Sequence, residues 1–86
     1  MKPSHPEMIS DTLQILRRYH GFPQKYLAVR LGVSQTAYSK MERGLTRVAG
    51  GHLDRVAQMY GLLPAELESK TGDEIIQNII ARKPQA

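Results

Sequence analysis

Two helical patterns in the middle of the chain are separated by only Gly32 and Val33. On both sides of this joint, apolar residues recur at spacings of three and four, which is the period of an amphipathic helix. Glycine adopts the positive φ that a tight reversal requires, and Ser34, which follows, is a favoured helix N-cap. A helix, a tight turn with glycine and a second helix form a helix-turn-helix unit. We therefore expect the second helix of such a unit from about Ser34 to Arg43.

The same periodicity runs along most of the chain and predicts an all-α fold. β-branched residues are few and no run of alternating apolar and polar residues appears, so no strand is expected. With 86 residues the chain can form one compact domain. We expect a flexible N-terminal arm over 1–8, a helix-turn-helix domain over 9–69, and a C-terminal helix and tail over 70–86. Within the domain, a fourth helix is expected from about Leu53 to Tyr60.

Positive charge is concentrated in the middle of the chain. The segment from Arg17 to Arg55 holds eight Lys and Arg residues against two acidic ones, a net charge of +6, while the remainder holds four against six, a net charge of −2. A cationic centre with mildly acidic flanks is typical of a surface that binds a polyanion such as nucleic acid. A solvated charged surface is the alternative that charge alone leaves open.

Several function classes find no support in the residue pattern. His5, His20 and His52 have no Cys or carboxylate neighbours at ligand spacing, so we expect no metal. No glycine-rich phosphate loop and no nucleophile with a credible base appears, so neither a cofactor nor an enzymatic activity is expected. No segment approaches the roughly 18 apolar residues of a membrane span. Since the chain also lacks cysteine, we expect a soluble, cytoplasmic protein that has no membrane partner and associates with the nucleoid when it is bound to DNA.

The residues of the helix-turn-helix unit also follow a longer pattern. It consists of Gly21-Phe22-Pro23-Gln24, Leu27-Ala28, Leu31-Gly32-Val33-Ser34, Tyr38-Ser39 and Glu42-Arg43-Gly44, and it continues to Leu67 without a gap. In this pattern the sequence resembles the Cro/CI/XRE family of prokaryotic regulators. The resemblance implies a five-helix lambda-repressor-like bundle, here followed by an additional C-terminal helix. It also implies binding of double-stranded operator DNA, usually as a homodimer, with the second helix of the motif as recognition helix in the major groove.

The resemblance and the outward-facing side chains together define a candidate DNA-binding site. The expected base contacts lie on the outer face of the recognition helix: Gln35, Thr36, Ser39 and Lys40. The expected phosphate contacts are Gln24, Lys25, Arg43 and Arg47. The family also pairs an arginine with a glutamate to tie the first helix to the end of the third, and Arg17 and Glu42 stand at these positions. We expect this ion pair to be structural.

The sequence departs from the family pattern at several positions. Pro23 stands where a capping Ser or Thr is usual. Tyr38 replaces the usual Ile or Val, so its hydroxyl needs a partner or must reach the edge of the core. Val48 stands where a loop proline is common, and Gly50-Gly51 makes a weak helix start. The loop before the fourth helix is therefore expected to be more flexible than usual.

The last helical segment carries an isoleucine stripe outside the family pattern: Ile75, Ile76, Ile79 and Ile80. The stripe either packs on its own domain or forms a dimer interface, because exposed apolar stripes need a covering surface. We expect a homodimer, since one recognition helix offers few base contacts, and a symmetric dimer requires an inverted-repeat operator. The favoured function is a sequence-specific transcription regulator, acting as a repressor or autoregulator. The alternative is an antitoxin-like module whose main role is to bind a protein partner such as a toxin.

Overall fold

The computed structural model describes the chain over residues 5–82, with side chains from residue 9 onward. This part of the chain forms six helices and no strand, which confirms the all-α prediction for it. The helices are α1 (His5–His20), α2 (Gln24–Leu31), α3 (Gln35–Glu42), α4 (Gly50–Tyr60), α5 (Pro64–Ser69) and α6 (Gly72–Arg82).

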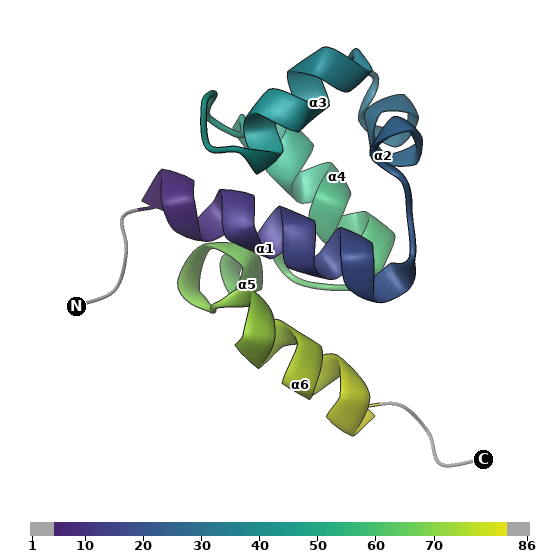
Figure 1. Cartoon of the computed structure of the whole chain (residues 1–86). Coiled ribbons are helices and arrows are strands. Elements are labelled where there is room, and N and C mark those ends of the chain that lie inside the picture. The colour runs from purple at the N-terminus through teal and green to yellow at the C-terminus, as the bar shows by residue number, and fades with distance from the viewer. Residues whose placement is uncertain (1–4, 83–86) are drawn as a thin grey trace.

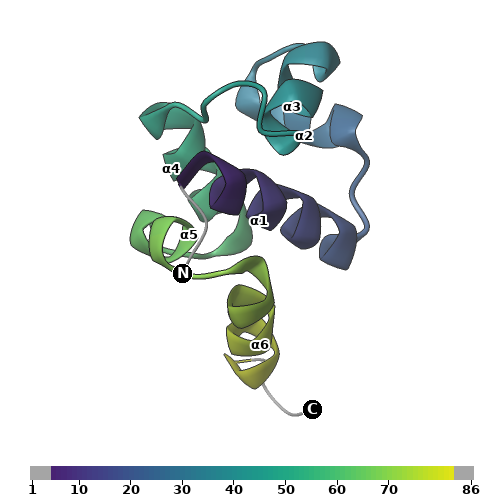
Figure 2. The same cartoon turned by 60° about the vertical axis from the view of Figure 1, so that its left-hand side comes forward.

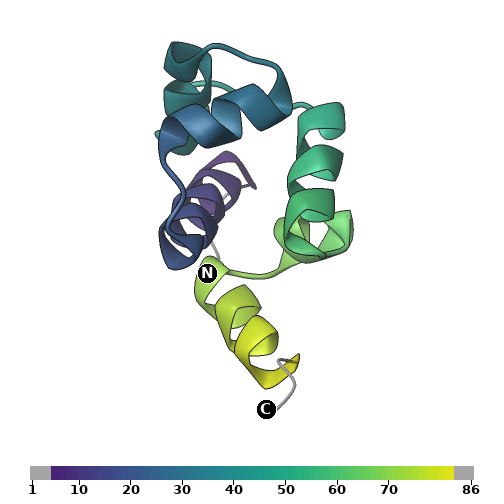
Figure 3. The same cartoon turned by 90° about the vertical axis from the view of Figure 1, so that its right-hand side faces the viewer.

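Helix α1 crosses the middle of the molecule, as Figure 1 shows, with α2 and α3 on one side of it and α5 and α6 on the other. Figure 2 shows that α6 extends away from the other helices. In Figure 3, α2 and α3 lie across one end of α1 and α4, and α6 lies at the opposite end. The fold therefore separates the helix-turn-helix from the isoleucine-rich last helix.

Two helices begin earlier than the sequence patterns indicate. Helix α1 starts at His5, so the expected arm over 1–8 is too long, and its first four residues lie outside the described part. Pro6 is compatible with this start because the first turn of a helix needs no backbone N–H from proline. Helix α4 starts at Gly50, three residues before Leu53, with Ala49 in extended backbone ahead of it. Glycines do not prevent this start, since helix N-termini tolerate residues that weaken a helix interior.

The turn between α2 and α3 has the expected local chemistry. Gly32 takes the left-handed conformation at φ 71°, and the backbone N–H of Val33 donates to the carbonyl of Ala28 at 3.0 Å. The Ser34 hydroxyl oxygen accepts from the backbone N–H of Ala37 at 3.0 Å and caps α3. These local bonds fix where α2 ends and where α3 starts.

One apolar core joins all six helices. Its fully or nearly fully buried members are Leu13, Leu16, Leu27, Ala28, Leu31, Tyr38, Met41, Leu53, Val56, Ala57, Leu62, Leu67 and Ile75. Burying an aliphatic side chain of this size stabilises the fold by roughly 1.5 to 3 kcal/mol. Because α2 and α3 contribute five of these residues, the core holds the helix-turn-helix in a fixed orientation.

Helix α6 packs on α1 through a close approach at Gly72. A Cβ atom at Gly72 would lie 2.7 Å from Cδ1 of Ile15 and 3.0 Å from its Cβ, so only glycine fits this contact. Ile75 is fully buried, Ile76 and Ile79 pack partly against the core, and Ile80 remains 47% exposed. The expectation that Ile75 belongs to a dimer interface is therefore corrected, because the monomer's own core already encloses it.

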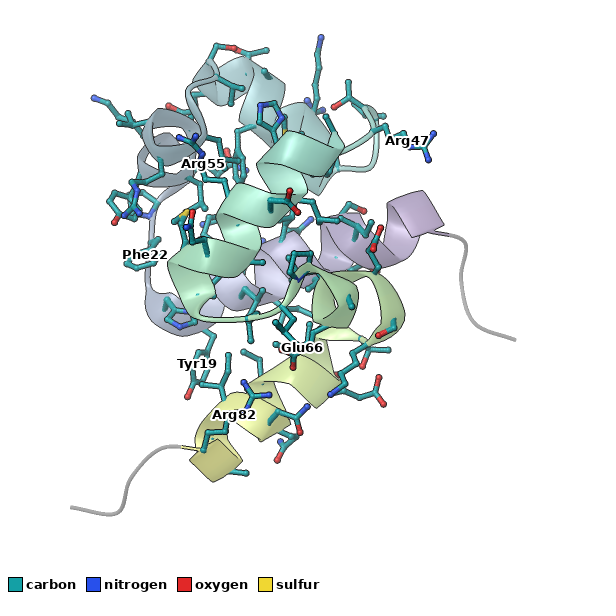
Figure 4. All side chains as sticks on the ribbon, turned by 180° about the vertical axis from the view of Figure 1, so that it is seen from behind. Tyr19, Phe22, Arg47, Arg55, Glu66 and Arg82 are labelled. Carbon is teal, nitrogen blue, oxygen red and sulfur yellow. The ribbon has the colours of Figure 1, made fainter. Side chains whose placement is uncertain are left out.

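A carboxylate holds α6 against α5. Glu66 Oε2 accepts from Arg82 Nη2 at 3.0 Å and lies 3.7 Å from Lys70 Nζ, while Oε1 accepts from the backbone N–H of Leu63. Figure 4 shows Arg82 extending from α6 toward Glu66. The backbone bond from Leu63, aided by Arg82, holds the pKa of Glu66 below its ordinary value. This one side chain thus caps α5 and anchors the end of α6.

Candidate nucleic-acid interface

Helix α3 divides cleanly into an inner and an outer face. Tyr38 and Met41 are buried, whereas Gln35, Thr36 and Lys40 are exposed. Residues three and four apart share a face of an α-helix, so Tyr38 and Met41 lie on one face while Thr36 and Lys40 lie on another. The outer face therefore presents amide, hydroxyl and ammonium groups to solvent, and all of these can hydrogen-bond to base edges.

The structure brings five of the predicted contact residues into one shallow groove. The lining residues are Gln24, Gln35, Thr36, Ser39 and Arg43, and we call this the α2–α3 groove. It combines the N-terminal end of α2 with the outer face of α3, two regions that the turn at Gly32 places side by side. Expected base contacts and expected phosphate contacts therefore meet on one surface.

The remaining predicted contacts lie elsewhere on the surface. Lys25 and Lys40 are exposed, but neither of them lines the groove. Arg47 lines a separate concavity formed by the α3–α4 loop together with residues of α1, α4 and α5. Figure 4 shows Arg47 extending outward from this loop. Arg47 is therefore not part of the α2–α3 groove.

A buried ion pair fixes the end of α3 to α1. Arg17 Nε donates to Glu42 Oε2 at 2.5 Å and Nη2 donates to Oε1 at 3.1 Å, and the two side chains are only 13% and 2% exposed. Arg17 Nη1 also donates to the carbonyl of Phe22 at 2.9 Å, which ties the α1–α2 connection to the same group. The structure contains the predicted pair, and the burial of both side chains is consistent with the expected structural role.

Gln24 links the groove to this ion pair. Its Nε2 donates to Glu42 Oε1 at 3.0 Å. Burial by itself raises the pKa of Glu42, but hydrogen bonds from Arg17 and Gln24 outweigh burial and hold that pKa below its ordinary value. Burial also raises the pKa of Tyr38, whose buried hydroxyl has no hydrogen-bond partner among the described residues. The ionised Glu42 therefore orients Gln24 at the mouth of the groove.

The helix-turn-helix domain family matches residues 9–69, which is most of the chain. The chain belongs to this family. Its fold is similar to that in the crystal structure of the hypothetical transcription factor NHTF from Neisseria, with a TM-score of 0.71, 20% identity, and coverage of 87% of this chain and 85% of that chain. It is also similar to the clp gene regulator ClgR from C. glutamicum, with a TM-score of 0.68, 24% identity, and coverage of 98% and 100%. No curated protein sequence matches the chain.

The helix-turn-helix domain leaves most of its central cations unpaired. Of the eight Lys and Arg residues between Arg17 and Arg55, only Arg17 forms an ion pair among the residues that the structure describes. The other seven are exposed to solvent. A surface with uncompensated positive charge attracts polyanions over distances near the Debye length of about 8 Å at physiological salt.

One contact of the helix-turn-helix domain has no counterpart in the sequence pattern. Gln14 Nε2 donates to the backbone carbonyl of Glu42 at 3.0 Å and so satisfies a carbonyl at the C-terminal end of α3. The two residues are 28 positions apart, and a partly buried glutamine at this spacing carries no sequence signal. Within residues 5–82, no group of His, Cys, Asp and Glu could hold a metal ion, and no helix is long and apolar enough to cross a membrane.

Proposed function

We propose that this protein is a DNA-binding transcription regulator that inserts α3 into the major groove. The α2–α3 groove carries the proposal, because it collects five polar side chains along the outer face of an α-helix, an element that the major groove accepts. Gln35 and Thr36 lie in the first turn of α3, the part of a recognition helix that reaches base edges. Ser39 and Lys40 lie one turn further along and extend this reading face.

Phosphate contacts on both sides of α3 would set its register. Lys25 and Gln24 approach the DNA backbone from α2, and Arg43 approaches it from the end of α3. Gln24 is suited to this role because Glu42 already fixes its side chain through a hydrogen bond. Arg47 would contact a phosphate further along the duplex, since the loop holds it outside the groove.

The protein acts, in this proposal, as a symmetric dimer on an inverted repeat. Two recognition helices would enter major grooves about 34 Å apart. The exposed apolar surface of α6 supports the interface, with Ile80 at its centre and the half-buried Ile76 and Ile79 beside it. A protein bound in the major groove of a promoter excludes other proteins from the same base pairs. We therefore propose repression as its mode of action.

Sequence-specific binding is tested by selecting a preferred site from random DNA duplexes and then measuring the affinity for that site by fluorescence anisotropy. We expect Gln35→Ala to weaken binding to the selected site by about 1 to 3 kcal/mol and to leave binding to random DNA nearly unchanged. Gln77→Ala is the matched control, because Gln77 is an exposed helical glutamine on α6, away from the groove. Equal losses on both DNAs would make Gln35 a backbone contact, and a chain that selects no site would refute the proposal.

Analytical ultracentrifugation of Ile80→Asp tests the dimer. Ile80 is exposed, so aspartate there places like charges in the proposed interface without burying a charge in the monomer. We expect a monomer with unchanged helicity by circular dichroism. Leu63→Asp is the control, because Leu63 is also an exposed apolar residue, 68% accessible, but lies between α4 and α5. A dimer that survives Ile80→Asp would place the interface elsewhere.

A further inference from the structure

A second cationic concavity lies between α2 and α4. Its lining residues are Arg30, Arg55, Gln58 and Met59, and we call it the α2–α4 notch. Figure 4 shows Arg55 extending from α4 toward α2. The notch shares no residue with the α2–α3 groove. It therefore places two arginines together on a surface that the proposed DNA contacts do not use.

Both arginines lack a carboxylate partner within the described part of the chain. The positions three and four residues away from Arg30 and from Arg55 hold no acidic residue, and these are the positions that share a helix face. Asp54 adjoins Arg55 in sequence, but neighbouring helical residues point in different directions. The positive charge of the notch is thus available to an external anion.

Arg30 is held ready for such an anion. Its Nη1 donates to the hydroxyl of Tyr26 at 2.7 Å, and its guanidinium carbon lies 5.7 Å from the centre of the Tyr26 ring. These contacts restrict the side chain and leave other guanidinium N–H groups free for a bidentate carboxylate. A restrained side chain loses less conformational entropy on binding, and Tyr and Arg are the residues enriched at binding hot spots.

The position of the notch argues against a DNA phosphate as its occupant. Arg30 follows Gln24 by six residues, which moves it about 9 Å along α2 and about 120° around it. The notch is also small, about 170 Å³, and open, whereas pockets for small molecules usually enclose about 300 to 1,000 Å³. A shallow cationic recess with aromatic and methionine surface beside it suits a side chain presented by a protein. We propose that the α2–α4 notch is a docking site for an acidic segment of a protein partner, with Arg30 and Arg55 gripping its carboxylates.

Binding of a labelled peptide to the full chain tests this proposal. The probe is a short fluorescein-labelled peptide in which Glu alternates with Leu, and the control peptide has Gln in place of every Glu. We expect the combined change Arg30→Ala and Arg55→Ala to weaken probe binding by about tenfold or more, equal to about 1.4 kcal/mol. The same variant should keep its affinity for random DNA within about twofold at physiological salt. Arg30 and Arg55 contact no phosphate in the proposed complex, and salt screens charges that lie farther from the DNA than the Debye length of about 8 Å.

A matched variant separates this site from the proposed DNA function. Lys40→Ala with Arg43→Ala removes the same charge from the exposed face and the end of α3 and should weaken DNA binding while sparing the peptide. Circular dichroism verifies that each variant is folded, because replacing exposed arginines should not change the helical content. The variant Arg30→Lys with Arg55→Lys keeps the charge but loses the forked donors, and its affinity for the probe should also fall.

Four outcomes overturn the proposal. They are equal binding of the Glu and Gln peptides, unchanged peptide binding by either notch variant, and peptide loss in the groove variant as large as in the notch variant. The fourth is a loss of DNA affinity in the alanine notch variant, with a salt dependence reduced by about two counterions, which would make the notch a phosphate contact. Failure of the groove variant to affect DNA binding bears on the proposed function and not on the notch.

Discussion

Replacing Arg17 with methionine removes two hydrogen bonds from a carboxylate that is 2% exposed. Stranding one partner of a buried ion pair typically costs about 3 to 5 kcal/mol. Gln24 still donates to Glu42, which favours the lower end of that range, about 3 kcal/mol. The bond from Arg17 to the Phe22 carbonyl is also lost, at about 1 kcal/mol. We therefore expect Arg17→Met to lower the free energy of unfolding by about 4 kcal/mol.

The reverse substitution should be milder. Glu42→Gln leaves a guanidinium that is 13% exposed and can reach water, so we expect a loss of about 2 kcal/mol. The double variant has no stranded charge and should lose less than the sum of the single losses, with a coupling energy of about 1 to 3 kcal/mol. At about 4 to 8 °C per kcal/mol for a domain of this size, Arg17→Met should lower the Tm by about 16 to 32 °C.

The stability of Arg17→Met should depend on pH in the opposite direction to the stability of the wild type. In the wild type the pKa of Glu42 is held below its ordinary value of 4.5, so its contribution to stability is present above that value and is lost as the pH falls through the folded pKa. Without Arg17, burial is no longer outweighed and raises the pKa of Glu42. The stability of Arg17→Met should then fall as the pH rises through about 4.5, so the substitution costs less in acid than at neutral pH.

Urea unfolding followed by circular dichroism, at acidic and neutral pH, measures the stability losses, the coupling energy and their dependence on pH. The wild type, the two single variants and the double variant complete a double-mutant cycle. Additivity of the two losses within about 0.5 kcal/mol would refute a coupled buried pair. A loss below 1 kcal/mol for Arg17→Met would show that the pair behaves as an exposed surface bridge.

Three further predictions follow from local geometry. Gly72→Ala should destabilise the protein by about 1 to 3 kcal/mol in thermal melts, because the new Cβ would meet Ile15. Gly50→Ala places its Cβ in open space and should stabilise α4 by about 0.4 to 1 kcal/mol. The opposite order of stability would refute the packing of α6 on α1. Ser34→Ala should cost about 1 kcal/mol in urea unfolding through loss of the cap of α3, and no loss would contradict it. Lys25→Ala should reduce the slope of log affinity for DNA against log salt by about 0.9, and an unchanged slope would contradict a phosphate contact.

The helix-turn-helix could be predicted because local spacing determines it. The turn at Gly32 and the cap at Ser34 depend on backbone bonds between residues a few positions apart, which leave a clear sequence pattern. The outer face of α3 follows from helical periodicity in the same way. The pairing of Arg17 with Glu42 was predictable for a different reason, namely the resemblance to a known family.

Helix boundaries and the isoleucine stripe show where sequence reasoning failed. The start of α4 at Gly50 depends on how the chain leaves the preceding loop, because glycine itself favours no helix. The spacing of the four isoleucines on α6 indicates a helix but does not say which of them is buried. The close approach of α6 to α1 decides that Ile75 is buried and Ile80 is exposed. Two isoleucines five positions apart on one helix thus have opposite surroundings.

The amino-acid sequence by itself determined the helices, the tight turn and the polar outer face of α3, because these arise from interactions within about one or two helical turns. Only the tertiary structure decided that Gln24 joins the α2–α3 groove through Glu42, and that Arg30 and Arg55 meet in a separate notch. The physical reason is distance along the chain: Gln24 and Glu42 are 18 residues apart, and their contact exists only after the core has set the angle between the helices.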